Sequence, residues 1–212
     1  MKKLLSLLLI LCLLASATAV FAEEEEAALS ADELSALEAN MQADDPEEAY
    51  LAYVRYCGTL ISAMSSLGYD LGHTPYTLYN SYKLTSTTNK NNLNFAKKIV
   101  IMNDPWSLTS AQRSTSDASW STIQSLRNAY INYFKYLDLL NLAIQSKPSV
   151  PAKYTRVDTL ITSSQKSMTS MGSIIKSFYT GSSTDTMAFW GQCEDLYWHN
   201  DVILLKAMCY FE

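Results

Sequence analysis

Apolar residues recur along this chain at steps of three and four residues and almost never alternate with polar ones. Four stripes of this kind can be traced. They are Tyr50, Tyr53, Cys57, Leu60, Met64 and Leu67; Ile123, Leu126, Tyr130, Tyr133, Leu137, Leu140 and Ile144; Tyr154, Val157, Ile161, Ser164, Met168, Met171, Ile175 and Phe178; and, less regularly, Trp190, Cys193, Tyr197, Leu204, Met208 and Phe211. This period is typical of amphipathic α-helices that pack at shallow angles. The sequence therefore predicts an all-α, four-helix-bundle-like domain.

The first bundle helix is expected to begin at a proline and to end at a glycine. Asp45 before Pro46 supplies an N-cap and a first-turn proline. Gly68 is expected to end this helix, with Gly72 in the loop beyond it. We therefore predict a long crossover between the first two bundle helices. It holds two short helices, one near Thr74-Pro75 and one over 89–102.

Helix breakers separate the other three predicted helices. Read as one helix, residues 105–146 would run about 63 Å, well beyond the length of the others. The polar run 114–117 competes for backbone hydrogen bonds, which places the start of the second helix near Ala118. Prolines at 148 and 151 then lead to a third helix over 152–179, and the turn 181–183 leads to a fourth over 185–211.

The first 22 residues have the order of a secretory signal peptide. Two lysines precede an apolar run over 4–14, and small residues end at Ala22, where we expect cleavage. The alternative is an uncleaved anchor, because residues 4–22 are just long enough to span a bilayer. Cleavage would leave the protein in the periplasm or outside the cell without a stable membrane anchor. The short basic start and the lack of an N-glycosylation sequon favour a bacterial origin.

Charge is distributed unevenly over the rest of the chain. Residues 23–48 carry eleven acidic and no basic side chains, whereas 49–212 carry ten acidic and fourteen basic ones. The acidic leader 23–46, which we expect to be partly disordered, resembles an interaction tail or a solubilising leader. The small basic excess of the helical domain, 47–212, is too scattered for a nucleic-acid interface. The charge pattern therefore argues against nucleic acid as a partner.

The sequence carries no recognisable catalytic constellation. It contains no glycine-rich phosphate loop, no G-x-S-x-G elbow and no H-E-x-x-H motif. Asp195 and His199 are four residues apart and would share one helix face. Such a pair is half of a metal site or an ordinary surface ion pair. We accordingly predict no enzymatic activity, no metal and no cofactor, with Asp195 and His199 as the lesser metal candidates.

The candidate binding residues are aromatic. The glycine-flanked segment 68–76 suits recognition if it forms a surface loop, because it contains Tyr69, His73 and Tyr76. Trp190 and Trp198 are further candidates, since tryptophan is a frequent hot spot in interfaces. Together with the missing catalytic residues, these side chains favour a secreted interaction module that binds an unknown protein or cell-surface partner.

Two other functions stay open at this point. The tyrosines and serines of the stripes favour a small-molecule pocket between the helices, as bundle ligands usually bind there. The apolar segments 60–67 and 202–208 suggest a membrane-active protein whose helices open and insert.

Three cysteines follow the predicted cleavage site. An odd number in an oxidising compartment allows at most one internal disulfide. Cys193 and Cys209 lie on one predicted helix, where sixteen residues separate them by roughly 24 Å, too far for a bond. Any disulfide therefore joins Cys57 to Cys209 or Cys193. The alternative is that all three are buried thiols.

Overall fold

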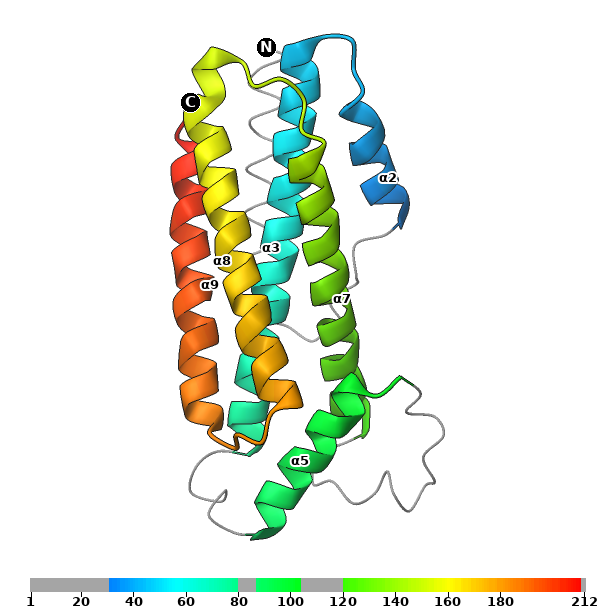
Figure 1. Ribbon diagram of the computed structural model, residues 1–212, viewed down its shortest axis with the longest axis vertical. Coiled ribbons are helices and arrows are strands. Elements are labelled where there is room, and N and C mark those ends of the chain that lie inside the picture. The colour runs from blue at the N-terminus through cyan, green and yellow to red at the C-terminus, as the bar shows by residue number, and fades with distance from the viewer. Residues whose placement is uncertain (1–30, 80–86, 104–119, 211–212) are drawn as a thin grey trace. The chain divides into compact units, whose positions relative to one another are not determined.

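The computed structural model describes residues 31–79, 87–103 and 120–210 of the chain (Figure 1). These residues are mostly helical and include no strand, which confirms the all-α class. The helices are α2 (Ala31–Asn40), α3 (Pro46–Leu78), α5 (Thr87–Ile101), α7 (Trp120–Gln145), α8 (Thr155–Thr180) and α9 (Thr186–Met208), with a 3-10 turn at Ala152–Tyr154 before α8. The expected signal peptide lies outside the described residues.

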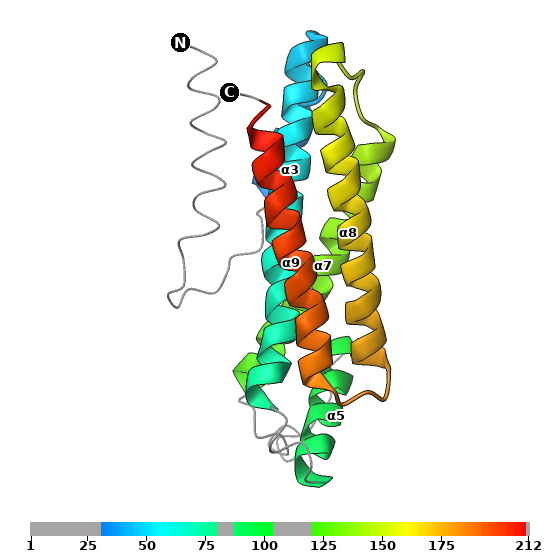
Figure 2. The ribbon, with the colours of Figure 1, turned by 90° about the vertical axis from the view of Figure 1, so that its left-hand side faces the viewer.

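The described helices fall into two compact units. Of the described residues, the first unit comprises 31–66, 136–168 and 199–210. The second comprises 67–79, 87–103, 120–135 and 169–198. Within each unit, segments of α3, α7, α8 and α9 lie side by side (Figures 1 and 2). Helix α2 belongs to the first unit and α5 to the second.

Local chemistry fixes several helix ends as predicted. The Asp45 carboxylate accepts a hydrogen bond from the Glu47 N–H at 2.9 Å and so caps α3. Helix α7 begins two residues after the predicted start, and the turn 181–183 separates α8 from α9. Asp185 caps α9, because its carboxylate accepts a hydrogen bond from the Ala188 N–H at 2.9 Å.

The prediction that the first bundle helix ends at Gly68 is wrong. Helix α3 continues through Gly68, Gly72 and Pro75 as far as Leu78, so segment 68–76 is helical and is not a loop. The first of the two short crossover helices is therefore part of α3. The second is confirmed as α5.

Two glycines in this part of α3 lie against side chains of neighbouring helices, and Gly72 allows α9 to approach closely. A Cβ atom built on Gly72 would lie 2.8 Å from the Cβ of Cys193 on α9, closer than real Cβ atoms come. A Cβ atom on Gly68 would collide with the side chain of Met171 on α8. Neither glycine has a positive φ. At Gly72 the missing side chain, and not a turn conformation, is therefore what the packing requires, whereas at Gly68 the flexible Met171 side chain could move aside.

Pro75 lies inside α3 at the cost of one backbone hydrogen bond. Its nitrogen has no hydrogen to donate to the Leu71 carbonyl one turn earlier. Tyr179 of α8 replaces the missing donor, because its hydroxyl donates to this carbonyl at 2.9 Å in a buried position. The helical pattern then resumes, as the Tyr79 N–H donates to the Pro75 carbonyl at 3.0 Å. A tertiary hydrogen bond thus compensates for the proline.

Helix α5 is attached to the turn between α8 and α9 by Lys97. Its ammonium donates to the carbonyls of Gly181 at 2.9 Å and Ser183 at 2.8 Å, and it lies 4.5 Å from the ring centroid of Phe178. The negative end of the α8 dipole and the aromatic face both favour a cation here. Burial nevertheless lowers the pKa of Lys97.

The first three predicted stripes form the core, whereas the fourth is only partly correct. Most members of the first three are completely buried, among them Tyr53, Met64 and Tyr133. On α9 the buried side chains are Thr186, Phe189, Cys193, Asn200 and Ile203. The predicted Leu204 is only half-buried. The reason is that α9 is apolar on two faces, and periodicity alone does not tell which one points inward.

Candidate functional site

An aromatic cluster lies between the last third of α3 and the first half of α9. Its members are Tyr69, His73, Tyr76, Trp190 and Tyr197. The three α3 residues share one helix face because they are four and three residues apart. All five side chains are half-buried, so the cluster also faces solvent. Four of the five predicted binding residues are thus brought together, on two helices and not on a loop.

Trp190 is the central member of the aromatic cluster. Its ring centroid lies 4.5 Å from that of Tyr69, 4.9 Å from that of His73 and 6.4 Å from that of Tyr76. His73 stacks on Tyr69 at 5.4 Å, and Tyr197 lies 5.2 Å from Tyr69. Such ring pairs each contribute about 0.5–1.5 kcal/mol beyond the area that they bury. The cluster therefore stabilises the α3–α9 contact and presents preorganised rings at the surface.

Acidic residues flank the cluster. Burial raises the pKa of the Tyr69 phenol, and the negative charges of Glu194 and Asp70 raise it further. Negative charge beside aromatic faces suits a partner with a cationic or hydrogen-bond-donating group. The arrangement can therefore bind and orient a partner, but it includes no nucleophile with an activating base.

The remaining predicted site residues lie apart from this cluster. Trp198 contacts it only through an edge-on approach to Tyr197 at 5.2 Å, and 56% of its surface is exposed. Asp195 and His199 are both exposed. Within the part of the chain that the structure describes, no three His, Cys, Asp or Glu side chains are grouped to hold a metal ion.

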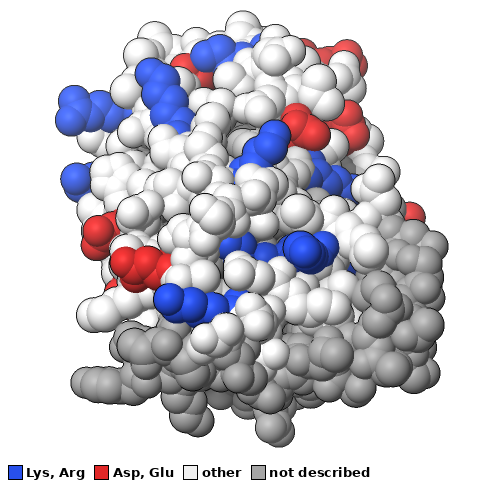
Figure 3. Space-filling model, turned by 60° about the horizontal axis from the view of Figure 1, so that its bottom comes forward, with Lys and Arg blue, Asp and Glu red and all other residues white. Residues whose placement is uncertain are grey.

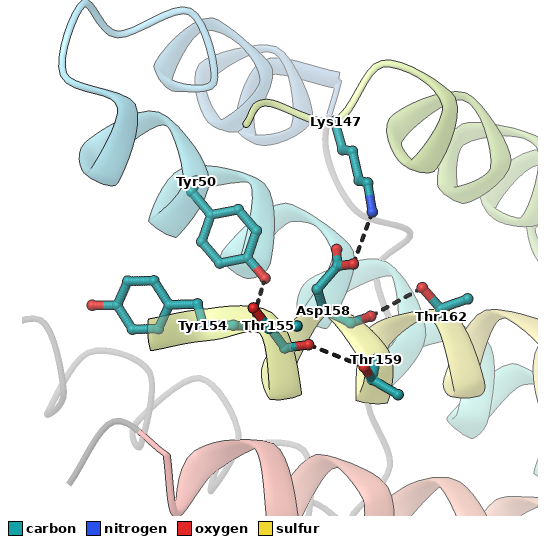
Figure 4. Close-up of polar contacts among 7 residues, drawn as sticks. All are labelled: Tyr50, Lys147, Tyr154, Thr155, Asp158, Thr159 and Thr162. Carbon is teal, nitrogen blue, oxygen red and sulfur yellow. Dashed lines mark hydrogen bonds and ion pairs between the residues drawn. The ribbon is translucent and has the colours of Figure 1, made fainter. Parts of the chain in front are cut away.

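A group of polar contacts joins the starts of α3 and α8 in the first unit (Figure 4). The Glu47 carboxylate accepts hydrogen bonds from the Lys153 ammonium at 2.6 Å and the Tyr154 hydroxyl at 3.0 Å. The Tyr50 ring stacks on Tyr154 with centroids 5.6 Å apart, and its hydroxyl donates to the Tyr154 carbonyl at 3.5 Å. No motif spacing in the sequence indicates this group, because its members come from separate helices.

Beside these contacts lies Asp158, whose two carboxylate oxygens have different surroundings. One carboxylate oxygen accepts a hydrogen bond from the Lys147 ammonium at 2.8 Å (Figure 4). The other is buried and has no hydrogen-bond partner among the described residues. Burial, and secondarily the charge of Asp158, raises the pKa of Tyr50. A lysine-paired carboxylate beside protonated phenols lacks the second acid or base of a catalytic pair, so we assign it a structural role.

In the described part of the chain the cysteines are free thiols, Cys57 and Cys193 buried and Cys209 exposed. The structure thus contains neither of the two disulfides considered for Cys57. Burial raises the pKa of both buried thiols to about 12. Since the thiolate is the reactive form, these two cysteines are inert at neutral pH. The thiol of Cys209, in contrast, is exposed and accessible to reagents in solution.

Buried tyrosines make the fold sensitive to alkali. Burial raises the pKa of Tyr50, Tyr53, Tyr133 and Tyr179 above that of an exposed phenol. The unfolded chain therefore loses these protons near pH 10 while the folded chain keeps them, so stability is complete below pH 10 and falls above it. The lowered pKa of Lys97 instead makes the stability rise with pH, but it is one group against four tyrosines.

We expect the free energy of unfolding to fall by roughly 1.4 kcal/mol per pH unit above pH 10 for each such tyrosine. Denaturant titrations at increasing pH, with tyrosinate absorbance recorded in parallel, measure this slope. Tyr53→Phe should lower this slope by the contribution of one tyrosine. A flat profile up to pH 11 would contradict the burial of these phenols.

Comparison of the chain with protein-family models, curated proteins and solved structures gave no match. No described helix is both long enough and apolar enough to cross a membrane.

Proposed function

We propose that this protein is an extracytoplasmic, non-enzymatic interaction module that binds a protein or cell-surface partner through the aromatic cluster of α3 and α9. The observation that carries the proposal is the gathering of five partly exposed aromatic side chains on one helix pair. Aromatic residues are enriched at the centres of interfaces and dominate their energetics. The flanking Glu194 and Asp70 would orient the partner.

We also propose that the chain is exported. Residues 1–22 act as a signal peptide that is cleaved after Ala22, the acidic leader 23–46 follows, and 47–212 form a four-helix-bundle-like domain in the periplasm or outside a bacterial cell. The signal peptide is supported by the order of residues 2–22, in which two lysines precede an apolar run and small residues. The absence of catalytic motifs from the sequence supports a binding role without metal or cofactor.

Nucleic acid is not the proposed partner. Figure 3 shows a face on which uncharged side chains cover most of the described surface, with Lys and Arg scattered among Asp and Glu. A nucleic-acid interface needs a continuous basic area. The charge on this face therefore supports a protein or surface partner.

Site-specific photo-crosslinking in the producing cells tests this proposal. A photoreactive phenylalanine in place of Tyr76 should capture a partner that mass spectrometry identifies, because this member of the cluster is partly exposed. The matched control is the same residue in place of Ile131, which is 46% exposed on α7. Equal capture at both positions, or none at 76, would contradict the proposal.

A second candidate function is small-molecule binding in the first unit. Ser65 and Ser164 are buried, and their hydroxyls have no hydrogen-bond partner among the described residues. Buried hydroxyls normally bond to protein, water or ligand. A non-covalent extra mass in the native mass spectrum would favour this candidate. The third expectation, membrane insertion, would require exposure of Leu60 and Met64, which are completely buried.

A further inference from the structure

Helix α9 has a second apolar face, opposite the one that it buries. Met187, Trp198, Val202 and Leu205 are 61%, 56%, 47% and 53% exposed. Cys209, an exposed free thiol, follows four residues later. Its N–H donates to the Leu205 carbonyl at 3.3 Å, so helical geometry extends to this residue. From Trp198 onward the face therefore advances in steps of four, three and four residues.

These steps are those of a coiled-coil heptad, in which positions a and d form the contact between two helices. If Trp198 and Leu205 occupy d, then Val202 and Cys209 occupy a. The residues that α9 buries within its own chain fall at b and f; they include Phe189, Cys193, Asn200 and Ile203. The inward face and the heptad face of α9 are thus separate, and the heptad face is open to solvent.

The acidic and basic residues beside this face, with one histidine, select the orientation of a partner helix. Glu194 and Asp201 occupy g positions, and His199 and Lys206 occupy e positions. In a parallel pair, a g residue meets the e residue five positions later on the other helix. Glu194 then meets His199 of the second copy, and Asp201 meets Lys206 of the second copy. An antiparallel pair instead brings g against g and e against e, so neither of these contacts forms.

We propose that α9 pairs with α9 of a second copy of this chain as a short parallel coiled coil, with Trp198, Val202, Leu205 and Cys209 in the contact. Asp195, at the preceding a position, would face its own counterpart and so limits the apolar contact to Trp198 onward. A contact of this length spans about 16 Å and buries less than about 1,200 Å², the range of weak complexes. The non-covalent dimer is therefore reversible.

The register places Cys209 of the two copies opposite each other, where a disulfide can form. A small-molecule disulfide is the oxidant. One Cys209 thiolate attacks it, forming a mixed disulfide and releasing one thiol, and the second Cys209 then displaces the other thiol. The two cysteines lose two electrons and two protons, and the small disulfide becomes two thiols. An oxidising compartment would thus convert a weak dimer into a covalent one.

Sedimentation velocity and non-reducing electrophoresis of the purified protein, with oxidised glutathione as the probe, test this pairing. We expect a reversible dimer under reducing conditions and a covalent dimer after oxidation. Cys209→Ser should abolish the covalent dimer and keep the reversible one. Leu205→Glu should weaken the dimer roughly tenfold or more, because it places charge in the contact. Leu142→Glu, at a 59% exposed leucine on α7, is the matched control and should dimerise normally.

Charge exchange tests the parallel orientation. Asp201→Lys should weaken the dimer, since it places two basic residues together, and adding Lys206→Asp should restore it. A protein that stays monomeric and uncrosslinked at all concentrations would overturn the proposal. So would a dimer that survives Leu205→Glu, because another surface would then form it. A reversible dimer that never crosslinks through Cys209 would overturn the parallel register.

Discussion

A Gly72→Leu variant is expected to lose roughly 3 kcal/mol or more of its free energy of unfolding, at the upper end of the overpacking range. The first added atom alone would lie 2.8 Å from the Cys193 Cβ and 3.2 Å from the Trp190 ring. The Cys193 Cβ is tied directly to the α9 backbone, so the contact cannot relax by a side-chain rotation. Helices α3 and α9 would have to separate, and the aromatic cluster would separate with them.

Gly58 supplies the control for this experiment. It lies in the same helix, and a Cβ atom built on it has no neighbour within 4 Å. Gly58→Leu should be neutral or stabilise by up to about 1 kcal/mol, because leucine is a better helix former than glycine. Denaturant unfolding followed by circular dichroism compares the two variants. Equal stability would mean that α3 and α9 do not approach each other at Gly72.

Tyr179→Phe should cost about 1–3 kcal/mol, since it leaves the buried Leu71 carbonyl without a hydrogen-bond donor. The same change should cost less than about 0.5 kcal/mol when Pro75 is already alanine, because the new Ala N–H can then donate to that carbonyl. The two single variants and the double variant form a thermodynamic cycle, measured by denaturant unfolding.

The decisive result of this cycle is whether the cost of Tyr179→Phe depends on the residue at position 75. A Tyr179→Phe cost that does not depend on residue 75 would show that the hydroxyl does not serve the carbonyl released by the proline. Pro75→Ala by itself is expected to be neutral or stabilising, as it removes a helix-interior proline.

Local signals in the sequence were sufficient for most of the fold but not for the end of α3. Asp45 and the turn 181–183 act within a few residues, so their effect can be read directly. Gly68, Gly72 and Pro75 are local stop signals as well, yet α8 and α9 supply contacts that override them. The Tyr179 hydroxyl comes from 108 residues away in sequence. Such compensation depends on which helices are neighbours, and periodicity does not reveal that.

The candidate site was predicted by residue type and not by arrangement. Tyr69, His73 and Tyr76 have helical spacing in the sequence, but the glycines beside them indicated a loop. Their partner Trp190 was also selected, though for a different reason, and Tyr197 was assigned to the core. The buried face of α9 was misplaced because the helix is apolar on two sides. The sequence therefore predicted which residue types take part in the site, but not which helices bring them together.

The close approach of α3 to its neighbours also restricts how this chain can diverge during evolution. Any descendant that keeps the contact between α3 and α9 has to retain glycine at 72, and a replacement of Pro75 would remove the need for a hydroxyl at 179. Distant relatives should therefore be recognisable by a glycine inside the first long helix, with proline three residues later, long after their overall similarity has been lost.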